Sequence, residues 1–421
     1  MRILWITNTV FPDLAKKLGL PQPISGGWMY ALADQLANFD EITLAVASTY
    51  SQKNLCKYVI NGITYYLLPY KNKKRYPKYL EKYWKNICDE FNPDIVHIHG
   101  TEYPRALACM RACPKLKYIV SIQGMNTTHY QYTLAGIDNM EIIKNITFRD
   151  IIKRDTLFNA RRKRRANTKY EKEYFEKCSY ILGRTKWDYA NVKSINKNVK
   201  YEFCNEILRN EFYTAKHWNL ENINRHSIFL SQASSPLKGL HIVLKAINLL
   251  KDEFPDIKIR IGGTNIIKKD TLLNRLKLSG YGKYINTLLK KYDLKYNIEF
   301  LGFLNVNEMI TEYQKAHIFI CPSSIENSPN SIGEAQLIGT PVIASYVGGI
   351  PDMVKDNETG LLYRFEEYAM LAENIRQIFN NDKLAINLSE NSQRAADKRH
   401  NYEKNIKQML QIYESILSVS K

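Results

Sequence analysis

Short apolar runs alternate along the chain with longer segments whose apolar residues recur at helical spacing. The first run, MRILWITN, is followed by EITLAVAST, GITYYLLPY and NPDIVHIH, and each has the composition of a buried strand. Between the first two, a loop reaches Gly26 and Gly27 and an amphipathic helix begins there. This order of strands and helices predicts an α/β fold with a parallel, doubly wound sheet.

The same alternation resumes after a polar stretch near residue 205. Apolar runs SIFLSQ, IKIRIGG, NIEFLGF, HIFICPSS and PVIAS are again separated by segments with helical spacing. A chain of 421 residues with 45% apolar content is long enough for two cores. We therefore expect a first domain at 1–205, a second at 206–397 and a final helix at 398–421.

The segment 321–349 carries the clearest chemical signal. Its apolar run ends in turn formers, which places Glu326 on a loop just past the carboxyl end of a strand, where open α/β sheets bind ligands. The next residues have helical spacing, so the N–H groups of 327–331 open a helix and can hold a diphosphate. Glu334 lies about one turn further, within reach of a ribose diol. An acidic loop before an amphipathic helix without catalytic meaning is the alternative.

Residues 321–362 resemble the retaining glycosyltransferase group 1 family of GT-B fold, also called glycosyltransferase family 4. The resemblance rests on two Glu residues eight positions apart, the GTPVIAS turn and strand, Gly348 with Gly349, and the later ETGLL. It implies two Rossmann-like domains that face each other across a cleft, with the C-terminal helix crossing back to the first domain. It also implies a metal-independent, retaining hexosyltransferase without a cofactor, of the kind used in synthesis of bacterial surface polysaccharides such as capsule and exopolysaccharide.

The resemblance assigns residues to the donor. Lys238, in PLKGL, corresponds to the family lysine that meets the donor diphosphate, and Glu326 would orient the sugar or stabilise charge on it. The donor-binding residues expected are Gly26, Gly27, Gln232, Lys238, Gly263, Thr264, Asn327, Ser328, Pro329, Asn330, Ser331 and Glu334. Gln232 and Ala233 stand where the family has an arginine, so neutralisation of the leaving phosphates would rest on Lys238, loop N–H groups and Arg184.

The first half supplies the expected acceptor residues, His99, Glu102, Tyr103 and Gln123. Gln123 stands where the family usually has histidine, and an amide cannot take a proton. His97 and His99 share one face of a strand, which makes a metal pair conceivable, but no third ligand follows nearby and we expect no metal. Arg184 ends a strand before a Thr185–Asp188 helix cap, and we predict a catalytic role for it.

Positive charge is concentrated in the first half. The net charge is +18, and residues 1–200 hold 33 Lys and Arg against 17 Asp and Glu. Basic and aromatic residues are mixed in 71–85, and 161–165 reads RRKRR. Both segments suit an anionic membrane surface or lipid carrier, or else ordinary solvated helices with their aromatics in the core.

The sequence favours a cytoplasmic enzyme, peripheral on the inner face of the membrane. No apolar run approaches the length of a span, no signal peptide is evident, and the seven Cys have the spacing of free, mostly core thiols. We expect a UDP-sugar donor and a glycan or lipid-linked oligosaccharide acceptor. The alternatives are a nucleotide-sugar epimerase of GT-B fold, or a protein that binds nucleic acid through its basic half. We expect no nucleic acid, because no recognised motif for it is present.

Overall fold

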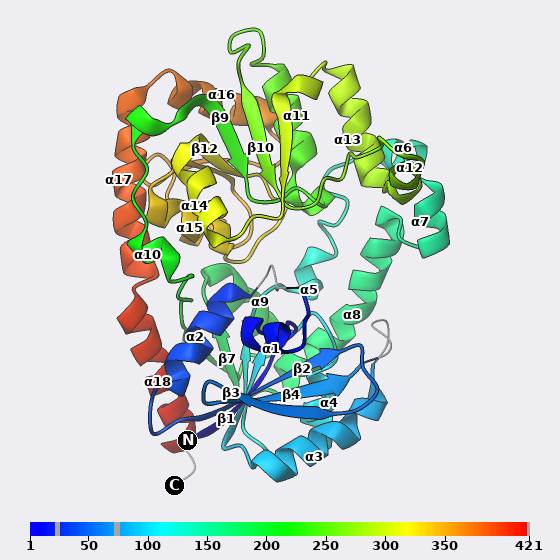
Figure 1. Cartoon of the computed structure of the whole chain (residues 1–421), viewed down its shortest axis with the longest axis vertical. Coiled ribbons are helices and arrows are strands. Elements are labelled where there is room, and N and C mark those ends of the chain that lie inside the picture. Colours follow the sequence, from blue (N-terminus) through cyan, green and yellow to red (C-terminus); the bar gives the residue numbers. More distant parts are fainter. Residues whose placement is uncertain (22–25, 71–75, 419–421) are drawn as a thin grey trace. The chain divides into compact units, whose positions relative to one another are not determined.

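The computed structural model describes residues 1–21, 26–70 and 76–418, and its contacts divide the chain into two units. Unit 1 comprises Met1–Thr127, Ala166–Arg209 and His400–Lys421, and unit 2 comprises Thr128–Arg165 and Asn210–Arg399 (Figure 1). Two of the boundaries fall close to the predicted ones. Residues 128–165 differ from the prediction, because they belong to unit 2 although they interrupt the sequence of unit 1.

Among the described residues, the sheet of unit 1 has eight strands in the order β3-β4-β2-β1-β5-β6-β7-β8. Only β3 is antiparallel to its neighbour, so the predicted doubly wound parallel sheet is confirmed. The strands are β1 (Arg2–Ile6), β2 (Thr43–Tyr50), β3 (Cys56–Ile60), β4 (Ile63–Pro69), β5 (Ile95–His99), β6 (Tyr118–Ser121), β7 (Tyr180–Gly183) and β8 (Lys200–Phe203).

Helices cover both faces of this sheet and create two apolar cores. One core packs beneath α3 (Glu81–Phe91), α4 (Leu107–Ala112) and part of α8 (Leu157–Lys177), and the other beneath α1 (Pro12–Lys17), α2 (Gly27–Ala37) and α18 (Tyr402–Ser418). The remaining helices that lie in unit 1 or begin in it are α5 (Asn126–His129) and α9 (Lys186–Ile195).

The C-terminal helix α18 belongs to unit 1, where it was expected to pack. Its buried face includes Ile406, Met409 and Tyr413. The Tyr413 hydroxyl accepts a hydrogen bond from Trp5 Nε1 at 3.0 Å and lies 2.6 Å from His97 Nδ1. His97 is fully buried and its Nε2 lies 2.7 Å from Ser121 Oγ, so it is a core histidine that ties strands to the last helix.

The sheet of unit 2 has six parallel strands in the order β11-β10-β9-β12-β13-β14. They are β9 (Asn224–Leu230), β10 (Lys258–Gly262), β11 (Ile298–Gly302), β12 (Ala316–Cys321), β13 (Val342–Ser345) and β14 (Leu361–Tyr363). The helices are α6 (Asn139–Lys144), α7 (Phe148–Lys153), α10 (Glu211–Thr214), α11 (Leu240–Asn248), α12 (Leu272–Lys277), α13 (Gly280–Lys291), α14 (Val306–Lys315), α15 (Asn330–Ile338), α16 (Tyr368–Phe379) and α17 (Asp382–Arg399).

All seven cysteines are free and five of them are buried, as the sequence predicts. Within the described ranges, every helix is too short or too polar to cross a lipid bilayer.

A buried carboxylate holds the loop after β6 in place. Glu171, on α8, is inaccessible to solvent and accepts hydrogen bonds from Thr101 Oγ1 and from the N–H groups of Asn126 and Thr127, at 2.5–3.0 Å. Burial raises its pKa to about 7 in spite of these hydrogen bonds. Because no cation offsets its charge in this set of contacts, ionisation of Glu171 opposes folding.

We expect Glu171→Gln to flatten the dependence of stability on pH. The folded-state pKa of about 7 lies above the ordinary 4.5, so the folded state holds the proton more tightly and loses stability as pH rises through this window. The wild-type free energy of unfolding, minus that of the variant, should fall by on the order of 3 kcal/mol from about pH 4.5 to about pH 8. Urea unfolding at several pH values measures this difference, and parallel curves for the two proteins would contradict the prediction.

Candidate functional site

The candidate site lies where the strand order of unit 2 reverses. The chain places β10 and β11 on one side of β9, and β13 and β14 on the far side of β12, so β9 and β12 flank the switch point. Their loops emerge side by side at the carboxyl ends of two parallel strands. Open α/β sheets bind ligands at this place.

Two glycines let the loops of this region approach closely. Gly239 has φ +68°, and a Cβ there would lie 1.7 Å from the carbonyl oxygen of Pro322. Gly348 has φ +53°, and a Cβ there would lie 1.9 Å from the carbonyl oxygen of Glu326. The same carbonyl oxygen accepts a hydrogen bond from the N–H group of Gly349. Both positions therefore require glycine, and the loop that bears Glu326 is fixed from two sides.

Lys238 and Glu326 form an ion pair at the centre of the site. Lys238 Nζ lies 2.5 Å from Glu326 Oε1, and the side chains are only 25% and 16% exposed. Ser323 Oγ donates to the same carboxylate oxygen at 2.8 Å. Burial raises the pKa of Glu326, but the Lys238 ammonium and the Ser323 hydroxyl outweigh burial and lower it overall. Burial lowers the pKa of Lys238, yet Glu326 raises it overall, so both groups are charged at neutral pH.

The structure adds two residues that the sequence reasoning missed. His129 is partly buried, and this burial lowers its pKa to about 4 against the opposing charge of Glu326. Arg164, from the RRKRR run, lowers the pKa of both His129 and Lys238 through its charge. The site therefore holds a neutral imidazole and a second cation, both supplied by the 128–165 segment. Only the concentration of basic residues in 161–165 marked that segment in the sequence.

The loop before α15 and the first turns of that helix carry half of the twelve predicted donor residues. The helix begins at Asn330, after Pro329, and Asn327 is buried in the preceding loop. Ser328 Oγ contacts Met353 Sδ and the guanidinium of Arg399. Glu334 is buried one turn into the helix, where Tyr313 OH lies 3.3 Å from Glu334 Oε2 and donates to the carbonyl of Ser331 at 3.1 Å.

The other predicted donor residues of unit 2 lie on neighbouring strand ends. Gln232 lines a small hollow together with Lys238, Glu326 and Ser331. Gly263 has φ +87° and donates to the carbonyl of Gly302, at the end of β10, and Thr264 follows it. The structure therefore brings the residues predicted from the second half of the chain to one edge of one sheet.

In unit 1, two of the four predicted acceptor residues meet. Glu102 Oε1 accepts from Gly124 N at 2.7 Å, and both Glu102 and Gln123 lie against Gly100. Tyr103 is half-exposed and stacks with the guanidinium of Arg105. Gly26, with φ +87°, caps α2, which begins at Gly27.

His99 is buried rather than open to solvent. It packs against the rings of Trp5, Trp28 and His97, and burial lowers its pKa to about 3, with a smaller effect of the Arg184 charge. Neither ring nitrogen of His99 has a hydrogen-bond partner among the described residues. Across the described ranges, no group of three or more His, Cys, Asp and Glu could hold a metal ion, and metal independence stays a prediction.

Arg184 lies inside unit 1, only 7% exposed. Its guanidinium pairs with the buried carboxylate of Glu206 and donates to the carbonyl of Ile122. The predicted Thr185–Asp188 capping box is present at the start of α9. Glu206 balances the charge of Arg184, and the catalytic role of Arg184 stays a prediction.

Three of the four aromatic residues of 76–85 belong to the core or pack against it, and the fourth, Tyr79, is 41% exposed. Trp84 is fully buried and donates to the carbonyl of Arg105, while Tyr76 and Tyr83 pack against the same core. Lys71, Lys73, Lys74 and Arg75 lie outside the described residues. Of the two interpretations of this segment, the structure favours a solvated helix with buried aromatics.

Solved structures share this fold over the full chain. Sucrose-phosphate synthase from Thermosynechococcus elongatus has a TM-score of 0.75 and 16% identity, covering 100% of both chains. Anabaena Alr3699/HepE in complex with UDP-glucose has a TM-score of 0.67 and 13% identity, covering 99% of this chain and 100% of the other. The two doubly wound units define a GT-B fold, as predicted.

Comparison of the sequence with known families gives a match for part of the chain. Residues 216–395 match the family described as glycosyl transferases group 1. This match covers less than half of the chain and lies within unit 2.

Curated relatives of the chain include D-inositol 3-phosphate glycosyltransferase of Corynebacterium urealyticum, 28% identical over 43% of this chain and 41% of the relative. Another is the putative colanic acid biosynthesis glycosyltransferase WcaL of Escherichia coli, 26% identical over 33% of this chain and 32% of the relative. The chain thus matches less than half the length of either relative.

We expect Gly239→Ala to destabilise the protein by about 2–5 kcal/mol, since the strain of a left-handed conformation adds to a collision with Pro322. Gly302→Ala is the matched control, because Gly302 also has a positive φ but a Cβ there would meet no atom within 4 Å. The control should cost only about 1 kcal/mol. Chemical denaturation measures both, and equal losses would show that the close approach of the loops is unimportant.

Proposed function

We propose that the protein is a retaining glycosyltransferase that transfers a sugar from a UDP-sugar to a glycan or lipid-linked oligosaccharide in polysaccharide biosynthesis. The observation that carries the proposal is the Lys238–Glu326 pair at the switch point of unit 2, beside the start of α15. The match of residues 216–395 to the group 1 glycosyl transferases supports the choice of sugar transfer. UDP-glucose in the related HepE structure supports a uridine donor, and the similarity to WcaL supports a polysaccharide product.

In this proposal the donor diphosphate lies between Lys238 and the N–H groups that open α15. An ammonium has three N–H donors and Glu326 engages one of them, so Lys238 can also bind phosphate oxygens. The partial positive charge of the helix N-terminus adds to this attraction. Arg164 supplies further positive charge near Lys238. This charge compensates for the family arginine that is absent here, where the chain has Gln232 and Ala233.

The chemical step exchanges one bond at the anomeric carbon for another. The acceptor hydroxyl oxygen bonds to this carbon on the face from which the diphosphate departs, the carbon–phosphate-oxygen bond breaks, and the hydroxyl proton passes to the departing diphosphate. Fixed cations and N–H groups stabilise the charge that develops on the diphosphate, which is electrostatic catalysis without a metal. Glu326 orients the sugar or stabilises its positive charge, and Glu334 holds the ribose.

The donor base and the role of Lys238 can be tested together by thermal shift with UDP, GDP and ADP. UDP should raise the unfolding midpoint of the wild type, because a ligand at a hundredfold excess over Kd stabilises the native state by ~2.7 kcal/mol. The shift should shrink in Lys238→Ala, measured from that variant's own unliganded midpoint. Lys355→Ala, at an exposed position of the same unit, is the control and should keep the full shift. If UDP raised the midpoint equally in all three proteins, Lys238 would have no role in binding the diphosphate.

Catalysis can be tested through UDP release from UDP-sugar, with water as the acceptor. Lys238→Ala should lower kcat by about 10²–10³-fold, the loss typical when one group that stabilises a leaving oxyanion is removed. Lys355→Ala should leave kcat unchanged. The anomeric configuration of a transferred sugar, read by NMR, tests retention, and an inverted product would refute that part of the proposal.

A further inference from the structure

Three short helices of unit 2 expose an unusual number of large apolar side chains. We call them the apolar patch: Met140 and Ile143 on α6, Phe148, Ile151 and Ile152 on α7, and Leu272, Leu273 and Leu276 on α12, each 53–73% exposed. Helices α7 and α12 contact each other, and α6 lies beside them (Figure 1). Single exposed apolar residues are common on protein surfaces, but eight on three neighbouring short helices indicate a candidate interaction site.

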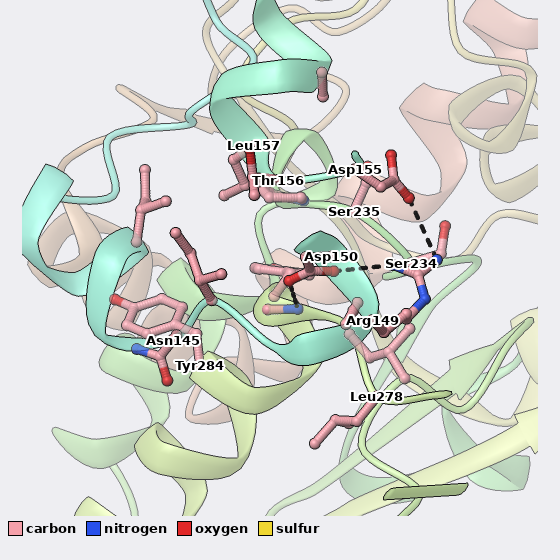
Figure 2. Close-up of a pocket in the computed structure, with 18 of the residues that line it drawn as sticks. Asn145, Arg149, Asp150, Asp155, Thr156, Leu157, Ser234, Ser235, Leu278 and Tyr284 are labelled. Carbon is pink, nitrogen blue, oxygen red and sulfur yellow. Dashed lines mark hydrogen bonds and ion pairs between the residues drawn. The ribbon is translucent and has the colours of Figure 1, made fainter. Parts of the chain in front are cut away.

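Polar contacts hold one side of α7 against the rest of unit 2, so its apolar residues face outward. Asp150 Oδ2 accepts a hydrogen bond from Gly280 N at the start of α13, at 2.8 Å, and Asp150 also completes a capping box with Thr147. Arg149 pairs with Asp150 at 3.0 Å and with Asp155 at 3.3 Å (Figure 2). These residues line a cavity of about 500 Å³ behind the helices. Because Arg149 and Asp150 are held inward, Phe148, Ile151 and Ile152 are left on the outside.

Basic side chains surround the apolar patch. Those exposed in the same segments are Lys144, Lys153, Arg154, Lys268, Lys269, Arg275 and Lys277, against the exposed acidic residues Asp138, Asp155 and Asp270. The RRKRR run continues this charge, since Lys163 Nζ donates to the carbonyl of Arg154 at 2.7 Å and Arg161, Arg162, Lys163 and Arg165 are exposed. The surface thus combines exposed apolar side chains with an excess of positive charge.

We propose that this surface docks unit 2 onto an anionic lipid bilayer. Apolar side chains that project from short helices enter the boundary between headgroups and acyl chains, while Lys and Arg around them contact lipid phosphates. A second copy of the chain fits less well, because two net-positive surfaces repel each other. The apolar patch is a different surface from the 71–85 segment, whose described aromatic residues are largely packed in the core. The inference goes beyond sugar transfer and does not depend on the donor.

The test is co-sedimentation of the full chain with vesicles, without any nucleotide. Vesicles of phosphatidylcholine alone are compared with vesicles in which about a third of the lipid is phosphatidylglycerol. The wild type should bind the anionic vesicles more tightly, and added salt should weaken the binding. Ile151→Ser/Ile152→Ser and Leu272→Ser/Leu273→Ser should each lower the partition coefficient at least about tenfold.

Leu249→Ser/Tyr296→Ser is the matched control, since it removes two exposed apolar side chains of unit 2 outside the apolar patch. It should bind vesicles like the wild type. All substituted positions are exposed, and the thermal midpoint of each variant verifies that it is folded. Failure of the wild type to bind anionic vesicles overturns the proposal, and so does binding by both patch variants that equals wild-type binding. So does a wild-type dimer that the patch variants convert to monomer while vesicle binding is unchanged.

Discussion

The close approach of two loops at the ends of β9 and β12 is the constraint on which the site depends. A side chain at Gly239 would overlap the carbonyl of Pro322, so the backbone itself forms the contact. This contact brings Lys238, one residue earlier, within hydrogen-bonding distance of Glu326. The ion pair in turn keeps a poorly exposed carboxylate ionised, because its own pKa would rise without the ammonium. Geometry and charge at the site are therefore consequences of one backbone contact.

Much of this arrangement could be read from the sequence because it is local. The strand–loop–helix units around Lys238 and Glu326 are each continuous in sequence, and parallel pairing brings their carboxyl ends to one edge. The fold class and the placement of the final helix followed from periodicity and from the family resemblance. The capping box at Thr185 and the buried cysteines were equally local inferences, and the structure has both.

The rest could not be read because it depends on contacts between distant segments. Nothing in residues 128–165 indicates that they pack with unit 2, so the proximity of His129 and Arg164 to Lys238 was out of reach. Arg184 has the position of a site residue, at the end of a strand, but a distant partner, Glu206, balances its charge. For the aromatic residues near Trp84, the composition of the segment did not tell whether the rings are buried or exposed. Only their packing against the rest of the unit decides this.

Unit 1 is assembled from three separate pieces of the chain, and this has a consequence for its biosynthesis. Trp5 and Tyr413, which hydrogen-bond in its core, stand 408 positions apart. During translation, the sheet face that α18 covers is complete only after residues 402–418 have left the ribosome. Until then Trp5 and its neighbours are exposed to solvent, and contacts of such long range form slowly. Unit 2 has its last residue at Arg399, so the newly made chain can finish unit 2 before unit 1 is stable.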